Sequence, residues 1–176
     1  MAEPLPDRET ALNTFNRARE GLETAYASVP DDALRYLPPG DDYTLGGLAA
    51  HVTDTLLGYG GVLNQMVSAG FGEVHTSDAN DAAKQRRDRL VREGFGPDER
   101  PGVFQEMSQA HEAVASQVRA LNPADFSRAA PVYFGDAQEP YQTRAGDLLQ
   151  WLSDHYDEHT LQVAELLARW RETQAR

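Results

Sequence analysis

The chain of 176 residues contains no cysteine. This absence excludes disulfide bonds, thiolate metal ligands and a cysteine nucleophile, because each of them requires the cysteine sulfur. If thiol chemistry takes place on this protein, the thiol therefore has to come from a substrate or a cofactor.

Long apolar runs and basic residues are also scarce. No segment reaches the roughly 18 to 20 consecutive apolar residues of a membrane-spanning helix, and the nearest stretch, residues 45–67, is interrupted by Gly, Thr, Asp, Asn and Gln. The formal net charge of −12 disfavours binding to nucleic acid or to an anionic membrane surface. Small molecules and other proteins remain as partners, and we expect a small-molecule substrate.

The amino-terminal segment lacks the features of a secretory signal. Residues 1–9 are acidic and contain proline, without a basic start or an apolar core. We therefore expect a cytoplasmic protein. The length and the apolar fraction of 40% suit a single domain over residues 1–176 with one hydrophobic core.

Apolar residues recur with helical spacing in four segments, which proline- and glycine-containing connections separate. The pattern predicts long helices over about residues 7–28, 44–68, 103–121 and 143–173. Asp7, Thr44 and Thr143 are the residues that we expect to cap three of these helices. A shorter helix is predicted over about residues 79–92, and residues 132–134 could form a short strand-like piece.

Four amphipathic helices without a convincing strand pattern predict an all-α fold, and specifically a four-helix bundle. The link of roughly 30 residues between the second and third long helices is long enough to cross the length of such a bundle. These two helices would then run parallel, and we expect the order up-down-down-up.

Three of the five histidines stand at positions that can converge. His155 and His159 are four residues apart, so both imidazoles lie on one face of a helix, within its apolar stripe. His51 lies at the edge of the apolar face of the second helix, from which it can reach a neighbouring helix. Buried imidazoles need partners for both ring nitrogens, and metal coordination meets this need. Three histidine nitrogens predict a divalent metal site with an open position for water or substrate.

Other side chains could support this site. The candidates to hold a ligand's second ring nitrogen or to line a pocket are Asp54, Trp151, Asp154, Glu158 and Gln162. His111 lies in the apolar seam of the third helix, and it would be level with His51 if the second and third helices are parallel. His111 is therefore a candidate fourth ligand or pocket residue.

Each of these features also has a plainer interpretation. A single histidine such as His51 is more often a hydrogen-bonded structural residue than a ligand. The spacing of His155 and His159 arises by chance in many helices. The basic stretch over residues 84–92 could bind an anionic cofactor, but such a stretch is more often a solvated helix face.

Two segments resemble the DinB-like superfamily of four-helix metalloproteins, which includes YfiT-type hydrolases and thiol transferases. Residues 43–51, Y-T-L-G-G-L-A-A-H, are similar to the family's turn into the second helix, which ends in its first ligand. Residues 147–163, D-L-L-Q-W-L-S-D-H-Y-D-E-H-T-L-Q-V, are similar to its H-x-x-x-H-x-x-Q pattern. Thr160 and Leu161 replace an Arg-Gly pair that is common in the family, and Tyr43 stands where Trp is frequent, so the subfamily stays open.

The resemblance implies a divalent metal bound by His51, His155 and His159, a pocket beside it, and a homodimer. Imidazole ligands suit zinc or nickel, with iron and manganese as further possibilities. The implied activity is that of a thiol S-transferase, with a low-molecular-weight thiol such as bacillithiol or mycothiol as co-substrate, or of a hydrolase. The catalytic group would be a metal-bound water or a substrate thiolate.

Two alternatives to an enzyme remain open. One is a non-enzymatic metal- or ligand-binding bundle, whose structural site would be closed by His111 or Asp54 as a fourth ligand. The other is a metal-free bundle that acts as a protein partner, in which the histidines only form hydrogen bonds in the core.

Overall fold

The computed structural model describes residues 6–77 and 81–175. These residues form α1 (Arg8–Ala27), a 3-10 turn (Asp31–Ala33), α2 (Gly47–Ser68), β1 (Val74–His75), α3 (Ala82–Glu93), α4 (Arg100–Ala120), α5 (Pro123–Ser127), β2 (Ala130–Tyr133), β3 (Tyr141–Thr143) and α6 (Ala145–Gln174). The expectation of a mostly helical protein is confirmed, with one small sheet added. In the part of the chain that the structure describes, no helix is long and apolar enough to cross a membrane.

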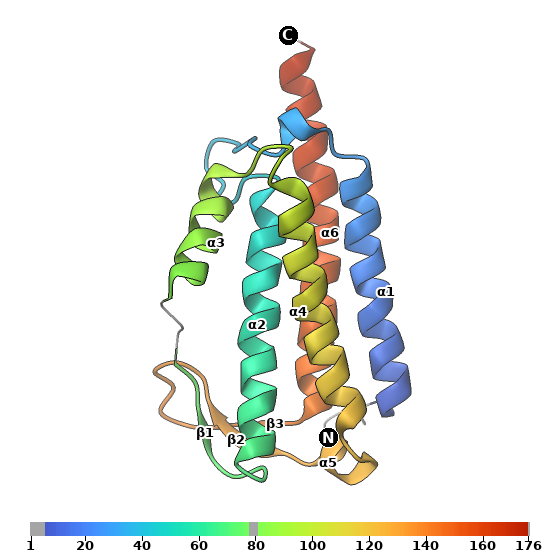
Figure 1. Cartoon of the computed structure of the whole chain (residues 1–176), viewed down its shortest axis with the longest axis vertical. Coiled ribbons are helices and arrows are strands. Elements are labelled where there is room, and N and C mark those ends of the chain that lie inside the picture. The colour runs from blue at the N-terminus through green and yellow to red at the C-terminus, as the bar shows by residue number, and fades with distance from the viewer. Residues whose placement is uncertain (1–5, 78–80, 176) are drawn as a thin grey trace.

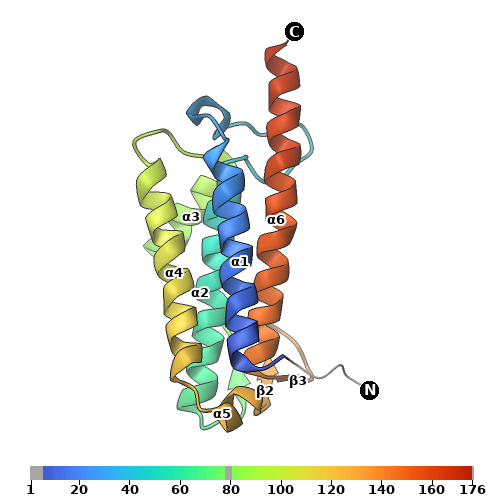
Figure 2. The same cartoon turned by 90° about the vertical axis from the view of Figure 1, so that its right-hand side faces the viewer.

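The long helices α1, α2, α4 and α6 lie side by side along the molecule, as Figure 1 and Figure 2 both show. The colour gradient of Figure 1 shows α1 and α6 running toward one end and α2 and α4 toward the other. Helix α2 contacts α4 and α6, and α1 packs against α6. The crossover between α2 and α4 contains β1 and α3, and α3 packs on α2. This arrangement places α2 and α6, the two helices that carry the candidate ligands, next to each other.

Buried apolar side chains from all four long helices form one core. Phe15 and Leu22 of α1, Leu56 of α2, Met107 of α4 and Leu166 of α6 are each at most 1% exposed. Burying a side chain of this size contributes about 1.5 to 3 kcal/mol. Packing of these stripes, more than the helix propensity of any segment, therefore holds the long helices in place.

Helix α2 begins at Gly47, and its N-cap residue is Gly46 and not the predicted Thr44. The Thr44 hydroxyl oxygen accepts a hydrogen bond from the Gly47 N–H, and the hydroxyl donates to the carbonyl of Val91 at the end of α3, both at 3.0 Å. A Cβ atom on Gly47 would lie 2.2 Å from that carbonyl oxygen, so only glycine allows α3 to approach this closely. The Gly46-Gly47 pair of the sequence motif therefore secures the start of the helix that carries His51.

The sheet includes the predicted strand-like segment. Val132 and Tyr133 belong to β2, which pairs in parallel with β1 and antiparallel with β3. The predicted cap of the last helix, Thr143, ends β3 instead. Helix α6 is capped by Arg144 and Asp147, because the Asp147 carboxylate accepts hydrogen bonds from the Arg144 backbone and guanidinium.

Two further helix starts differ from the sequence expectation. The predicted start of the short helix at Ala79 lies outside the described residues, and α3 is capped by the carboxylate of Asp81. Helix α4 begins at Arg100, before the predicted Val103. Pro101 fits there because the first turn of a helix makes no use of its missing N–H.

Candidate metal centre

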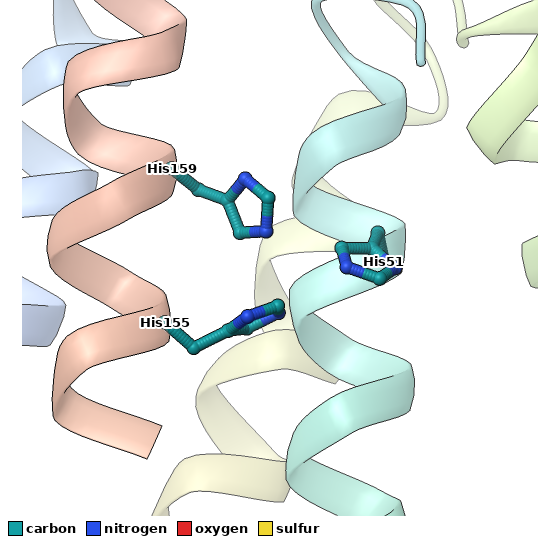
Figure 3. A group of neighbouring side chains, drawn as sticks. All are labelled: His51, His155 and His159. Carbon is teal, nitrogen blue, oxygen red and sulfur yellow. The ribbon is translucent and has the colours of Figure 1, made fainter. Parts of the chain in front are cut away.

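The packing of α2 against α6 brings together the three histidines that the sequence predicted to converge. One nitrogen from each of His51, His155 and His159 lies within 4.8 Å of the others. The ring centroids are 4.9 Å apart for His51 and His155, 5.0 Å for His51 and His159, and 4.3 Å for His155 and His159. Figure 3 shows the two α6 rings projecting from their helix toward α2, where His51 lies.

These separations suit a divalent metal ion. A zinc–imidazole bond is about 2.0 to 2.1 Å long, so two nitrogens that share an ion lie no more than about 4.2 Å apart. Small rotations of the rings would bring nitrogens that lie within 4.8 Å to this spacing. Three imidazoles form a donor set that suits borderline ions such as zinc and nickel.

His159 has the features of a prepared ligand. Its Nδ1 atom lies 2.8 Å from the Oε1 atom of Gln162, and because this amide oxygen only accepts, Nδ1 carries the hydrogen. The lone pair is therefore on Nε2, which is buried and has no hydrogen-bond partner within residues 6–77 and 81–175. Leaving a buried polar atom unpaired costs about 1 to 3 kcal/mol. A metal ion would remove this penalty, and Gln162 holds the supporting position that the sequence proposed.

Thr55, which the sequence analysis did not identify, supports His155 from the opposite helix. Its hydroxyl donates to the backbone carbonyl of His51 at 3.2 Å and lies 3.0 Å from His155 Nε2. Thr55 thus links the His155 ring to the backbone of the helix that carries His51. Thr55 follows His51 by four residues, so helical spacing was the signal that could have identified it.

Tyr43 packs against the same cluster. Its ring centroid lies 4.8 Å from that of His51 and 6.2 Å from that of His159. In the sequence, Tyr43 was notable only because Trp is frequent at this position in the family it resembles. In the structure, the Tyr43 ring packs against two candidate ligands.

Burial keeps all three imidazoles neutral. It is the largest cause that lowers the pKa of His51 to about 4 and the pKa of His155 to about 3, and repulsion from His159 acts in the same direction on both. Burial also lowers the pKa of His159, while the hydrogen bond to Gln162 acts in the opposite direction. Neutral imidazole is the form that binds a metal, so the cluster can accept an ion at neutral pH without first losing protons.

His111 does not join the cluster. It is fully buried on α4, where Nε2 lies 2.9 Å from Asn16 Oδ1 and Nδ1 lies 3.2 Å from the Tyr156 hydroxyl. Its ring stacks on Phe15, with the two centroids 3.9 Å apart. Both nitrogens are occupied by protein partners, so His111 is a structural core residue and not a fourth ligand or a pocket residue.

Asp54 and Glu158 do not support the ligands directly. Asp54 pairs with Arg87 and Lys84 of α3, and Arg87 also pairs with Glu106 of α4. The basic stretch of α3 is therefore largely a set of ion pairs that joins α3 to α2 and α4. Glu158 is exposed, and in the part of the chain that the structure describes it makes no hydrogen bond to a histidine.

A cavity of about 210 Å³ begins beside the cluster and is lined by Thr55, Gly58, Tyr59, Val62, Thr76, Ser77 and Phe134. Thr55 separates the cavity from His155, which it contacts. Trp151, which the sequence proposed as a pocket residue, lines a neighbouring pocket together with Tyr59, Phe134 and Tyr141. The two pockets share Tyr59 and Phe134 and are therefore neighbours.

Comparison with known proteins identifies the family of this chain. A model of the DinB superfamily matches residues 14–163, which include all three histidines. No curated protein matches the chain.

Among solved structures, a conserved protein from Enterococcus faecalis is similar with a TM-score of 0.62 and 13% identity, over 90% of this chain and 94% of that one. A protein from Streptococcus pneumoniae is similar with a TM-score of 0.61 and 9% identity, over 98% of this chain and 94% of that one. At such identities the likeness shows a shared fold. Because the family model covers most of the sequence, the chain belongs to the DinB superfamily.

Proposed function

We propose that this protein is a divalent-metal-dependent enzyme of the thiol S-transferase or hydrolase type, with His51, His155 and His159 as the metal ligands. The observation that supports this proposal most is the Nε2 atom of His159, which is buried and unpartnered in the described ranges while two further imidazoles lie beside it. An apolar core tolerates such an atom poorly, and coordination of an ion gives it a partner.

A bound zinc or nickel ion would lower the pKa of a coordinated water or thiol and so supply a nucleophile. The protein's own residues hold the ligands in position. Gln162 orients His159, Thr55 contacts His155, and the cavity lined by Thr55 offers space for a small molecule next to the cluster. Because the chain has no cysteine, the thiol of a transfer reaction would be a low-molecular-weight co-substrate.

The alternative is a non-enzymatic metal- or ligand-binding protein with a closed structural site. A closed site takes a fourth protein ligand, and both candidates for that role are engaged elsewhere. Asp54 pairs with Arg87, and His111 bonds to Asn16 and Tyr156. Within residues 6–77 and 81–175 the cluster consists of three histidines, which favours a site with an open position and hence an enzyme.

We also propose that α1, α2, α4 and α6 form an up-down-down-up four-helix bundle, which the helix directions in Figure 1 support. The protein would act on a small molecule in the cytoplasm as a homodimer, without nucleic acid or membrane as a partner. The net charge of −12 supports the last point, since it opposes contact with phosphate-rich surfaces. Sedimentation velocity of the purified protein tests the dimer directly.

Elemental analysis tests the metal site. Wild type is compared with His155→Ala and with the matched control His75→Ala, which removes an exposed histidine whose ring stacks on Tyr133. We expect about one divalent ion per chain in wild type and in the control, and loss of the ion in His155→Ala. Proteins are purified without a histidine tag. Absence of metal after reconstitution with zinc, nickel and manganese would overturn the proposal.

An activity screen separates the enzyme from the non-enzymatic alternative. Metal-loaded protein is assayed for conjugation of low-molecular-weight thiols with a panel of electrophiles, and for hydrolysis of ester and amide substrates. Acceleration that disappears in His155→Ala and persists in His75→Ala supports the enzyme. Stoichiometric metal without acceleration in either screen favours the non-enzymatic alternative.

A further inference from the structure

Four aromatic side chains line the pocket next to the metal-site cavity. Tyr59 belongs to α2, Tyr141 to β3 and Trp151 to α6. The fourth, Phe134, directly follows β2. Within the described part of the chain these four side chains alone line the pocket, whose volume is about 370 Å³. The face of an aromatic ring is negative and its edge is positive, so a cation would bind in this pocket against the ring faces.

The four rings form one aromatic cluster, called the cage below, in which Phe134 makes edge-to-face contacts with the other three rings. The Phe134 centroid lies 6.3 Å from that of Tyr59 at an interplanar angle of 82°, 6.0 Å from that of Trp151 at 69°, and 5.9 Å from that of Tyr141 at 69°. These are the distances of direct edge-to-face contacts, so each ring is held in place by its neighbours.

The charges near these rings favour a cation over a neutral aromatic or aliphatic group. The loop between Phe134 and Tyr141 contains Asp136 and Glu139, both exposed, and it contains neither Lys nor Arg. No ion pair in the described ranges engages either carboxylate. The next basic residue along the chain, Arg144, is held in the capping box of α6. Negative charge near the loop is therefore uncompensated by local basic side chains, in a chain whose net charge is −12.

The aromatic pocket and the metal-site cavity are neighbours, because Tyr59 and Phe134 line both of them. Thr55, which contacts His155, lines the cavity and not the aromatic pocket. The aromatic rings therefore lie one pocket away from the residue that touches a candidate ligand.

We propose that Tyr59, Phe134, Tyr141 and Trp151 form a subsite for a quaternary ammonium group, or a similarly alkylated cation, of the substrate. Cation–π attraction to several ring faces would hold this group, since a bulky alkylated cation sheds water more readily than a primary ammonium does. The idea that the same molecule also reacts at the metal rests on the proposed function. Binding of the cation in the cage does not depend on it.

Choline is the probe, and its neutral counterpart of the same shape, 3,3-dimethylbutan-1-ol, is the control ligand. The chain has two tryptophans, so the Trp170→Phe variant leaves Trp151 as the only tryptophan and makes its fluorescence a reporter for the pocket. We expect a saturable change with choline and at least about fivefold weaker binding of the neutral alcohol. Equal binding of the two ligands would overturn the cation subsite, and absence of binding by both would do the same.

Variants in the same reporter background locate the binding. Tyr141 is 60% exposed, so Tyr141→Leu leaves the core intact, and we expect it to weaken choline binding at least about fivefold. Tyr133→Leu is the matched control, because Tyr133 lies beside Phe134 in sequence but does not line the pocket. Equal weakening in both variants would contradict the assignment to the cage.

Measurements with chelator-treated and with metal-loaded protein separate the two proposals. Choline binding together with failure of metal binding or of catalysis would support the cage and contradict the proposed function. Metal binding and catalysis without choline binding would retain the proposed function and remove the cage.

Discussion

The Nδ1 atom of His159 lies 2.8 Å from the side-chain oxygen of Gln162, three residues further along α6. This hydrogen bond orients the imidazole and leaves its Nε2 atom, which is buried and unpartnered among the described residues, as the atom available to an ion. The candidate ligand and the residue that orients it are thus neighbours on one helix.

Replacing Gln162 should weaken metal binding without unfolding the protein. In Gln162→Ala the Nδ1–H of His159 loses its acceptor, and we expect the affinity for zinc to fall about 10- to 100-fold. Competition with a colorimetric chelator measures the affinity, and circular dichroism verifies the helix content. The control is Gln150→Ala on the same helix, where the side chain donates to exposed Asp154. Unchanged affinity in Gln162→Ala would contradict the supporting role.

Removing the Arg87 side chain should destabilise the protein. The side chain is only 8% exposed and joins Asp54 of α2 to Glu106 of α4. Arg87→Ala would leave a carboxylate largely buried without its main partner, and we expect a loss of about 2 to 4 kcal/mol in the free energy of unfolding. Glu106 is 30% exposed and can be hydrated. The expected loss of stability is therefore smaller than the loss on breaking a fully buried ion pair.

Urea unfolding of Arg87→Ala and of Arg89→Ala provides the comparison. Arg89 lies on the same helix, but its side chain is 50% exposed in its pairs with Glu93 and Glu99. An exposed pair contributes less than about 1 kcal/mol, so Arg89→Ala should change stability little. A similar loss in the two variants would show that burial does not distinguish these ion pairs.

The stability of the metal-free protein should fall as the pH decreases, in part because of His111. Burial, with repulsion from Arg19 and Arg119, lowers the pKa of His111 from 6.5 to about 3. Between these values the unfolded chain binds the proton and the folded chain does not, so acidification favours unfolding. The contribution of neutral His111 to the free energy of unfolding is fully present above about pH 6.5 and is lost progressively toward about pH 3.

The variant His111→Gln isolates this contribution. Its unfolding free energy, measured with chelator present, should fall less steeply below about pH 6.5 than that of wild type, by up to about 1.4 kcal/mol per pH unit. Subtracting the two profiles cancels the contribution of the other histidines. Parallel profiles would show that His111 does not couple folding to protonation.

Substituting Gly47 should loosen the contact between α3 and α2. In Gly47→Ala the new Cβ would lie 2.2 Å from the Val91 carbonyl oxygen, and we expect a loss of about 2 to 3 kcal/mol. The control, Gly61→Ala on the same helix, has no neighbouring atom within 4 Å of the new Cβ. It should stabilise α2 by up to about 1 kcal/mol, because alanine favours a helix over glycine. Thermal unfolding of the two variants should therefore shift in opposite directions.

Much of the candidate metal centre was predictable because several of its residues lie on one helix at helical spacing. His155, His159 and Gln162 lie on one face of α6, so helical spacing alone brings them together. The mostly helical fold followed from the same periodicity of apolar residues. His111 shows the limit of such reasoning. It also lies on an apolar seam, but its partner Asn16 comes from α1, 95 residues away, and no local pattern indicates which neighbour an element will meet.

The sequence by itself determined the chemistry that is available: no thiol, a set of amphipathic helices, and three histidines on two of their faces. Tertiary structure decided which groups meet. It brought the nitrogens of His51, His155 and His159 within 4.8 Å and turned Asp54 toward Arg87 of α3. It also gathered four aromatic rings from separate segments around one pocket. The reason is that periodicity encodes the face of one element, whereas the distance between two faces depends on how the whole core packs.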